Sequence, residues 1–346
     1  MRYATPRDPD AGRRTSNTIP AEAICVVGAG IAGLACARRL ASRNAQVIVL
    51  DKGRCPGGRA STRGEGAQAY DHGAQYLTAR DPRFLREVES WRRAGIAAEW
   101  SGRVGVLHGG VATSSEGSTR RFVGRPSMGA IARHLARGLD VRCSTRALAI
   151  EGEPGAWAVA TEAGASLGPF AHVIVSAPPP QSADLLERAA PDIAAALRGV
   201  RARPCWALMV DFDGPLPLAL DGAFVHDSHL AWIAREASKP DRAAGERWIL
   251  HASPEWSAAH LELDAGWIAR ELLAALTDAL ACAVPSARQA VAHRWRFATP
   301  DPVLPNPHLL DEELGLGACG DALGGPRVEG AWLSGTSLAE ALRVRA

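Results

Sequence analysis

The chain is poor in several residues on which particular protein functions depend. Among its 346 residues are two lysines, Lys52 and Lys239, and three tyrosines. Its seven cysteines are scattered without a Cys-x-x-Cys pair. Because metal sites and redox-active dithiols need closely spaced ligands, neither is predicted. A dispersed, odd-numbered set of cysteines favours the reducing cytoplasm.

Two further absences concern partners. No apolar run is long enough to span a bilayer. The formal net charge is only +2, whereas proteins that bind nucleic acid concentrate basic residues on one face. We therefore expect neither a membrane nor a nucleic acid as partner. The composition, 47% hydrophobic and 22% charged, is that of a globular protein long enough for two domains.

The N-terminus has the composition of a polar tail. Residues 1–19 are rich in Arg, Pro, Asp and Thr and are predicted to be mobile. Arg13-Arg14, followed by the apolar run at 23–37, resembles a twin-arginine export signal. That apolar run also carries the glycine motif described next, which cleavage would destroy. We therefore expect the protein to stay in the cytoplasm.

A dinucleotide-binding βαβ unit is predicted after this tail. The expected elements are a buried strand at 24–27, a Gly-x-Gly-x-x-Gly turn at 28–33, a helix at 34–42 and a second strand at 47–50. In such a motif the glycines allow a tight turn, close approach of a pyrophosphate and close helix–strand packing, while the helix N-terminus offers free N–H groups. Asp51, which ends the second strand, is placed to accept a hydrogen bond from a ribose hydroxyl.

Three later segments extend this motif beyond a plain NAD-binding domain. Gly57-Gly58-Arg59 combines backbone that can lie against phosphate with a guanidinium that can bind it, although a surface turn with a solvated Arg is the alternative. Gln75 could exchange a hydrogen bond with a flavin ring. Near the C-terminus a strand runs into Gly320-Asp321, and residues 327–335 open the last helix, where N–H groups could reach a ribityl chain. We therefore predict FAD.

One glycine pattern does not indicate a second nucleotide. Gly315-x-Gly317-x-x-Gly320 matches the fingerprint, but only 26 residues follow it, too few for another βαβ unit. Any nicotinamide nucleotide must then enter the cavity beside the flavin.

The predicted fold class is α/β, with a Rossmann-type FAD-binding domain and a mixed α+β substrate domain. The triple proline at 178–180 is expected to mark the chain leaving the first domain. The FAD-binding domain is assigned to 20–80, 127–180 and 309–346, and the substrate domain to 81–126 and 181–308. The cofactor-binding residues expected are Gly28, Gly30, Ile31, Ala32, Gly33, Asp51, Lys52, Gly58, Arg59, Gly73, Ala74, Gln75, Tyr76, Gly320, Asp321, Arg327, Val328, Glu329 and Ala331.

Several segments are shared with one known family. They are Val27 to Leu34, Asp51-Lys52, Gly57-Gly58-Arg59, the Gly-Ala-Gln-Tyr stretch at 73–76, Trp248 to Ala252, Ala292 to Ala298, Cys319-Gly-Asp and Arg327 to Gly335. Together they resemble the bacterial renalases of the flavin-containing amine oxidase superfamily, over nearly the whole chain after the tail. Position 72 is His where a leucine-like residue is expected in that family.

This resemblance implies an activity. The architecture would be that of amine oxidases and p-hydroxybenzoate hydroxylase, with noncovalent FAD. The reaction would be oxidation of 2- and 6-dihydro isomers of NAD(P) to NAD(P)+, with hydride passing to flavin N5 and O2 becoming H2O2. Because a dihydropyridine gains aromaticity when it loses hydride, catalysis would depend on positioning rather than on a strong base.

His251, Gln75, Arg294 and Trp295 are the residues expected to form the catalytic cavity. Arg294 could attract substrate phosphates. The alternatives are a satisfied core histidine for His251 and a solvated strand residue for Arg294.

Other functions remain in competition. A true amine oxidase typically presents an aromatic cage and a lysine near the flavin, and the scarcity of Tyr and Lys argues against it. A flavin monooxygenase would use NAD(P)H as reductant. A flavoprotein without turnover, acting as a sensor, is the third alternative.

Overall fold

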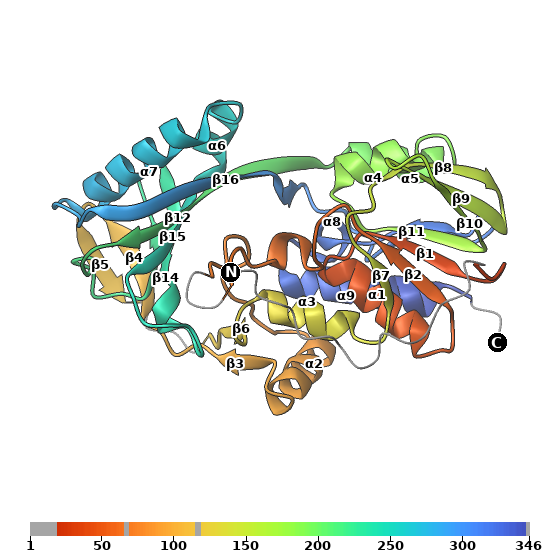
Figure 1. Ribbon diagram of the computed structural model, residues 1–346, viewed down its shortest axis with the longest axis horizontal. Helices are drawn as coiled ribbons and strands as arrows, with labels where there is room; N and C mark the ends of the chain where they lie inside the picture. The colour runs from red at the N-terminus through yellow and green to blue at the C-terminus, as the bar shows by residue number, and fades with distance from the viewer. Residues whose placement is uncertain (1–18, 66–68, 115–118, 344–346) are drawn as a thin grey trace, which may run out of the picture.

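The computed structural model describes residues 19–65, 69–114 and 119–343. The predicted tail lies outside the described residues, apart from Ile19. The described chain forms two lobes, each built on a large β-sheet, and the long strands β12 (Arg201–Phe212) and β16 (Ala287–Asp301) run from one lobe to the other (Figure 1). No helix of the described residues is both long and apolar enough to cross a membrane.

A six-stranded sheet with the order β17-β18-β11-β1-β2-β7 forms the first lobe. Its strands are β1 (Ile24–Val27), β2 (Val47–Leu50), β7 (Asp140–Arg142), β11 (His172–Val175), β17 (Leu309–Asp311) and β18 (Leu316–Ala318). All neighbours pair in parallel except β17, which is antiparallel to β18. The strands predicted at 24–27 and 47–50 are confirmed. The intervening helix α1 (Ile31–Ala41) begins earlier than the predicted 34, within the glycine motif, so that Gly33 lies in its first turn.

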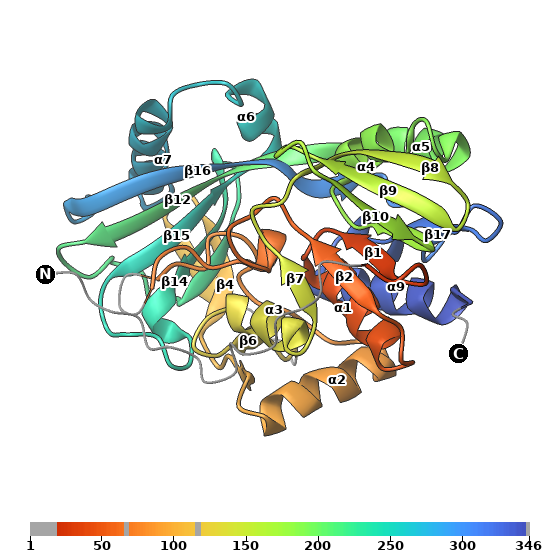
Figure 2. The ribbon, with the colours of Figure 1, turned by 45° about the vertical axis from the view of Figure 1, so that its right-hand side comes forward.

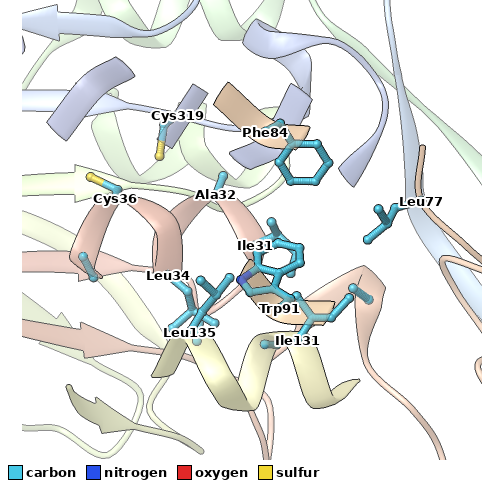
Figure 3. Close-up of a cluster of buried hydrophobic side chains, with 14 of the residues drawn as sticks. Ile31, Ala32, Leu34, Cys36, Leu77, Phe84, Trp91, Ile131, Leu135 and Cys319 are labelled. Carbon is cyan, nitrogen blue, oxygen red and sulfur yellow. The ribbon is translucent and has the colours of Figure 1, made fainter. Parts of the chain in front are cut away.

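Both faces of this sheet are covered, as expected for parallel strands (Figure 2). One face carries α1, α3 (Gly129–Ala136), α9 (Val328–Ala341) and, outside them, α2 (Pro82–Arg93); the other carries α4 (Pro179–Leu186), α5 (Pro191–Arg198) and the small sheet of β8 (Ala147–Glu153), β9 (Ala156–Thr161) and β10 (Ser166–Phe170). Figure 3 shows the core beneath α1, where Ile31, Leu34, Phe84 and Trp91 pack together.

The boundaries of the lobes differ from the predicted ones. The three prolines do not lead the chain away: Pro178 is the N-cap of α4, and Pro179 and Pro180 are its first residues, because proline is well suited to the first turn of a helix. Both α4 and α5 pack on the first sheet, and the chain crosses to the second lobe only with β12. Helix α2, assigned to the substrate domain, buries Phe84 and Trp91 against the first lobe.

The second lobe is a seven-stranded mixed sheet with the order β16-β12-β15-β14-β13-β4-β5. Its other strands are β4 (Val104–His108), β5 (Val111–Ser114), β13 (Gly222–Val225), β14 (Leu230–Arg235) and β15 (Arg247–Ala252). Helices α6 (Pro254–Ala259) and α7 (Ala265–Leu280) cover its outer face. Its inner face is turned toward the first lobe, and β3 (Ala97–Glu99) and β6 (Phe122–Gly124) form a small connecting pair.

Candidate cofactor and substrate site

The glycine turn after β1 has the geometry of a nucleotide-binding turn. Gly28 has φ +115°, a conformation that favours glycine, and a Cβ on Gly33 would lie 2.0 Å from the carbonyl oxygen of Gly28. Gly30 differs, because a Cβ there would meet nothing within 4 Å. Gly30 is also the N-cap of α1 and supplies no side-chain hydrogen bond. The first N–H groups of the helix are therefore free to bind a phosphate in the open space beside Gly30.

The predicted neighbours of this turn lie against it. Asp51 accepts hydrogen bonds from the N–H groups of Ala29 and Gly53, both at 2.6 Å. The residues Gly30 and Gly57 form a β-bridge, and a Cβ on Gly58 would meet the Gly30 Cα at 3.5 Å. The side chains of Ile31 and Ala32 point into the core, so these residues offer only their backbone. Lys52 is not brought to the turn; its Nζ donates to Gln181 Oε1 on α4 at 3.0 Å.

Two predicted segments 262 positions apart meet at Arg59 and Asp321. The Arg59 guanidinium makes a two-point ion pair with the Asp321 carboxylate, both bonds at 2.7 Å, and also donates to the Ala298 carbonyl. Gly320 lies beside them at the start of α8 (Asp321–Gly324), and a Cβ there would also meet nothing within 4 Å. Gly30 and Gly320 therefore border open space, as backbone that approaches a flavin dinucleotide requires.

The side chains that begin the last helix make contacts within the protein. Arg327 caps α9 from an exposed position. Glu329 is buried, and its carboxylate accepts hydrogen bonds from the N–H groups of Arg80 and Asp81 at 2.6 and 2.7 Å, so it fixes the start of α2. Val328 and Ala331 are partly buried and pack on the core beneath α1. Their side chains therefore have packing roles.

Four aromatic side chains gather where the two lobes meet: His72, His251, His293 and Trp295, here called the ring cluster. The ring centroids of His72 lie 4.7 Å from His293 and 4.9 Å from Trp295. The carbonyl of His72 accepts hydrogen bonds from Trp295 Nε1 at 2.9 Å and from His251 Nε2 at 3.2 Å. Since a carbonyl only accepts, His251 carries its proton on Nε2. His251 on β15 and Trp295 on β16 thus both bond to the turn that carries His72.

The ring cluster is electrically neutral at neutral pH. Burial lowers the pKa of His72 to about 3, with His293 and Arg63 as further causes. Burial also lowers the pKa of His251 to about 4 and depresses that of His293, beside which Arg63 is the nearest charge, its Nη1 3.5 Å from His293 Nδ1. Among the residues that the structure describes, no carboxylate bonds to these rings, and His72 Nδ1 is buried without a protein partner.

Strand alternation separates Arg294 from this cluster. His293 and Trp295 point to the inner face of β16, and the side chain between them points outward. There Arg294 donates to Glu262 and to the Leu261 carbonyl and lies 5.5 Å over the Trp206 ring. Arg296 pairs with the same carboxylate, which leaves both arginines on the outer face.

The turn at 73–76 is fixed by the protein itself. Gln75 is buried; its Oε1 accepts from Lys239 Nζ at 3.1 Å, and its Nε2 donates to the carbonyls of Asp71 and Gly73. The Ala74 N–H donates to the Arg59 carbonyl at 2.9 Å. Tyr76 packs between Trp100 and Trp232. Both polar atoms of Gln75 are therefore used within the protein, whereas the prediction gave them to the flavin ring.

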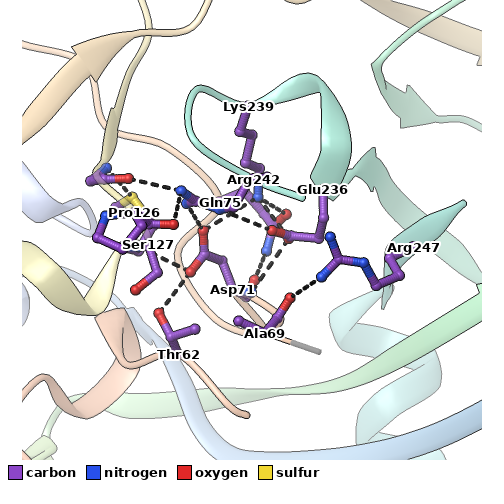
Figure 4. Close-up of polar contacts among 12 residues, drawn as sticks. Thr62, Ala69, Asp71, Gln75, Pro126, Ser127, Glu236, Lys239, Arg242 and Arg247 are labelled. Carbon is purple, nitrogen blue, oxygen red and sulfur yellow. Dashed lines mark hydrogen bonds and ion pairs between the residues drawn. The ribbon is translucent and has the colours of Figure 1, made fainter. Parts of the chain in front are cut away.

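Sequence reasoning missed the polar residues behind this turn. Asp71, Glu236, Lys239 and Arg242 form a buried set of four charged side chains, here called the ion network (Figure 4). Three of its members come from a short polar stretch after β14 that reads as a surface loop, and only the fold shows that it is buried. The sequence marks His72 only as a departure from the family pattern. No local pattern would have identified the ion network.

Comparison with known proteins agrees with this geometry. Residues 26–89 match the NAD(P)-binding Rossmann-like domain, and residues 103–343 match the flavin containing amine oxidoreductase family. Solved structures with a similar fold include a protein from Exiguobacterium sp. 255-15 assigned as a protoporphyrinogen oxidase, with 14% identity, a TM-score of 0.75, and coverage of 94% of this chain and 99% of that one.

Two further structures are similar. A reduced UDP-galactopyranose mutase gives 11% identity, a TM-score of 0.71, and coverage of 92% and 95% of the two chains. A putrescine oxidase bound to putrescine gives 13% identity, a TM-score of 0.63, and coverage of 92% and 98%. These likenesses confirm the predicted fold class. Because the family match spans more than half of the chain, this protein belongs to the flavin containing amine oxidoreductases and is a flavin-dependent oxidoreductase with a Rossmann-like nucleotide-binding domain.

Proposed function

We propose that this protein is an oxidase that uses noncovalent FAD to oxidise 2- and 6-dihydro isomers of NAD(P) to NAD(P)+. The observation that carries the proposal is the neutral ring cluster at the junction of the lobes, with Arg63 as the nearest charge. The resemblance to renalases in sequence supports the same substrate. The free state of all seven cysteines supports a cytoplasmic location.

The ring cluster suits a substrate that needs positioning and no base. The reaction takes one hydride from a dihydropyridine and, with O2 and one proton, yields NAD(P)+ and H2O2. The chemistry supplied by bound FAD is acceptance of the hydride and delivery of the electron pair to O2. His72, His293 and Trp295 offer flat, uncharged surfaces against which a nicotinamide ring can be held.

Charge distinguishes this substrate from an amine. A protonated amine is attracted by carboxylates, and no carboxylate of the described residues is hydrogen-bonded to a ring of the cluster; the adjacent Asp71 is paired with Lys239 and Arg242. The guanidinium of Arg63 would repel a cation and attract the phosphates of a dinucleotide. Lys239 is fully buried and bound to Gln75 and Glu236, so its ammonium is not presented to a substrate.

Anaerobic mixing tests the proposal. We expect the yellow, FAD-loaded protein to bleach within seconds of mixing with 2- or 6-dihydro-NAD and to recover, with one H2O2 per flavin, when air is admitted. A flavin that stays yellow with these compounds and bleaches with a primary amine such as putrescine would overturn the proposal in favour of an amine oxidase. A flavin that bleaches with neither would indicate a flavoprotein without this turnover, and reduction by ordinary NADPH would indicate a monooxygenase.

A further inference from the structure

The ion network adjoins the ring cluster along one short turn. We propose that Lys239 is a positioning residue for hydride transfer: through Gln75 it holds the turn at 71–75 in the shape that places the ring cluster. This inference rests on the proposed function for its kinetic readout, and it deepens that function by assigning a role to a residue outside the ring cluster.

Lys239 is held on all sides by acceptors. Its side chain is fully buried, and its Nζ lies 2.8 Å from Glu236 Oε1, 3.1 Å from Gln75 Oε1 and 3.7 Å from Asp71 Oδ2. An ammonium has three donors and no acceptor. Glu236 and Gln75 accept hydrogen bonds from it, whereas the Asp71 carboxylate at 3.7 Å contributes an ion-pair contact without a hydrogen bond. The bond to Gln75 also orients the amide, because Oε1 must face the ammonium and Nε2 must then face the turn (Figure 4).

Asp71 connects the turn to both lobes. Its carboxylate accepts from Thr62 Oγ1 at 2.7 Å and from the Met128 N–H at 3.0 Å, both in the first lobe. It also pairs with Arg242, which follows β14 of the second lobe. These cationic partners lower the pKa of Asp71 although its burial opposes that, so the carboxylate stays charged. The turn therefore begins at a fixed point between the lobes.

Members of the ion network and of the ring cluster alternate along residues 71–75. Asp71 belongs to the ion network, and His72 belongs to the ring cluster and accepts bonds from His251 and Trp295 with its carbonyl. Gln75 returns to the ion network and closes the turn by donating to the carbonyls of Asp71 and Gly73. A shift of the Gln75 amide would thus displace the carbonyl on which the ring cluster is assembled.

Stability alone gives a weak reason for such an arrangement. Exchanging a buried ion pair for apolar residues of similar volume is often neutral or stabilising, because taking charges out of water is costly. Burial does raise the pKa of Glu236, as expected for a carboxyl in this surrounding. Two atoms of the ion network, Glu236 Oε2 and Arg242 Nε, are buried without a hydrogen-bond partner and face each other 3.5 Å apart as an ion pair. The directional hydrogen bonds of the other members do, however, define one geometry more sharply than apolar packing does. Geometry is also what a hydride transfer without a base depends on.

A double-mutant cycle tests the coupling. We expect Lys239→Met and Gln75→Met each to slow anaerobic bleaching by 6-dihydro-NAD by about 10- to 100-fold, since a misplacement of about 1 Å can cost that much. The substrate concentration for half-maximal bleaching should stay the same. The double variant should be no slower than the slower single variant, because Lys239 acts on the turn through its hydrogen bond to Gln75, which both changes remove. Lys239→Arg should restore part of the rate, and Arg198→Met, which removes an exposed cation of α5, should bleach like the wild type.

A second readout does not depend on turnover. The visible absorption bands and the reduction potential of bound FAD should shift in the same direction in Lys239→Met and Gln75→Met, while Arg198→Met leaves both unchanged. A wild type that no dihydronicotinamide bleaches would sink the proposed function, and these two readouts would still decide the role of Lys239. If Lys239→Met fails to fold, Gln75→Met alone decides. Wild-type rates and spectra in the single variants, or effects that multiply in the double variant, would overturn the inference.

Discussion

The two ends of the candidate site are built in different ways. The nucleotide end is made of backbone and glycine: Gly28, Gly30 and Gly33 lie between the end of β1 and the first turn of α1, and Asp51 follows the end of the adjacent strand β2. The ring end is made of side chains that come from distant strands and share one carbonyl. At the nucleotide end, the space that glycine leaves by having no Cβ determines what can bind. At the ring end, the positions of the histidine and tryptophan rings determine it.

This difference assigns the two ends different tasks. Glycine turns and helix N-termini bind phosphate in proteins of many activities, so the nucleotide end accounts for the cofactor and little else. In the proposed function the neutral rings and Arg63 face the substrate, which would then be selected at the ring end. Substitutions at the two ends should therefore fail in distinguishable ways.

The largest effect is expected at the nucleotide end. Gly33→Ala would place a Cβ 2.0 Å from the Gly28 carbonyl oxygen, so the apoprotein should lose about 1–3 kcal/mol or more of unfolding free energy and should not retain FAD. Gly30→Ala meets no protein atom within 4 Å, so the apoprotein should melt like the wild type while its FAD affinity falls by at least about tenfold, or about 1.4 kcal/mol.

Thermal unfolding of the apoprotein and flavin absorbance per chain measure the two effects separately. Gly320→Ala is the matched variant at the other opening and should behave like Gly30→Ala, because its Cβ would also meet nothing within 4 Å. Wild-type FAD binding in both variants would show that neither opening faces the cofactor.

A smaller effect is expected at the ring end, where two adjacent residues can be compared. Trp295→Leu removes an inner-face ring and the N–H bond to His72, and it should slow flavin bleaching by about tenfold or more with FAD retained. Arg294→Leu changes the outer face, where an exposed ion pair is worth at most about 1 kcal/mol, and bleaching should stay within about twofold. Trp295→Phe separates the loss of the N–H from the loss of the ring. Equal slowing in Arg294→Leu and Trp295→Leu would indicate that Arg294 also acts at the substrate site.

The smallest effect concerns pH. In the folded chain the pKa of His251 is lowered to about 4 and that of His72 to about 3, whereas in the unfolded chain both take up protons near their usual value of 6.5. The unfolded state therefore binds more protons below that value. The unfolding free energy should decrease as pH falls from about 6.5, by about 1.4 kcal/mol per pH unit for each histidine.

Denaturant titrations at a series of pH values measure this slope. In His72→Leu the slope should be smaller by about 1.4 kcal/mol per pH unit, which is the contribution of one proton. Because both histidines are already neutral, flavin bleaching should be independent of pH between about 6 and 8. A bleaching rate that depends on a group titrating near pH 6.5 would contradict the assignment of neutral rings.

The two ends also differ in how far the sequence predicts them. The turn at 28–33 and Asp51 could be predicted because their contacts connect residues close in the chain, and a glycine is required wherever backbone approaches backbone. His251 and Trp295 were selected through the family resemblance, and nothing local joins them to His72. Arg294 was grouped with Trp295 because the two are adjacent, but adjacent strand residues face opposite sides. The burial of Lys239 depends on the packing of one lobe against the other, which no local pattern encodes.

The long strands β12 and β16 bear on how a substrate reaches this site. Their ladder pairs 201–203 with 299–301 near the first lobe and 205–212 with 287–295 in the second lobe, and a bulge on β16 separates the two stretches. Where two strands are paired regularly over many residues they bend little, because bending would break several backbone hydrogen bonds at once. Bending of the two strands is therefore expected at the bulge, which lies next to Trp295. Along the regular stretches, entry and release of a substrate would depend on side chains and short loops, which move faster than whole domains.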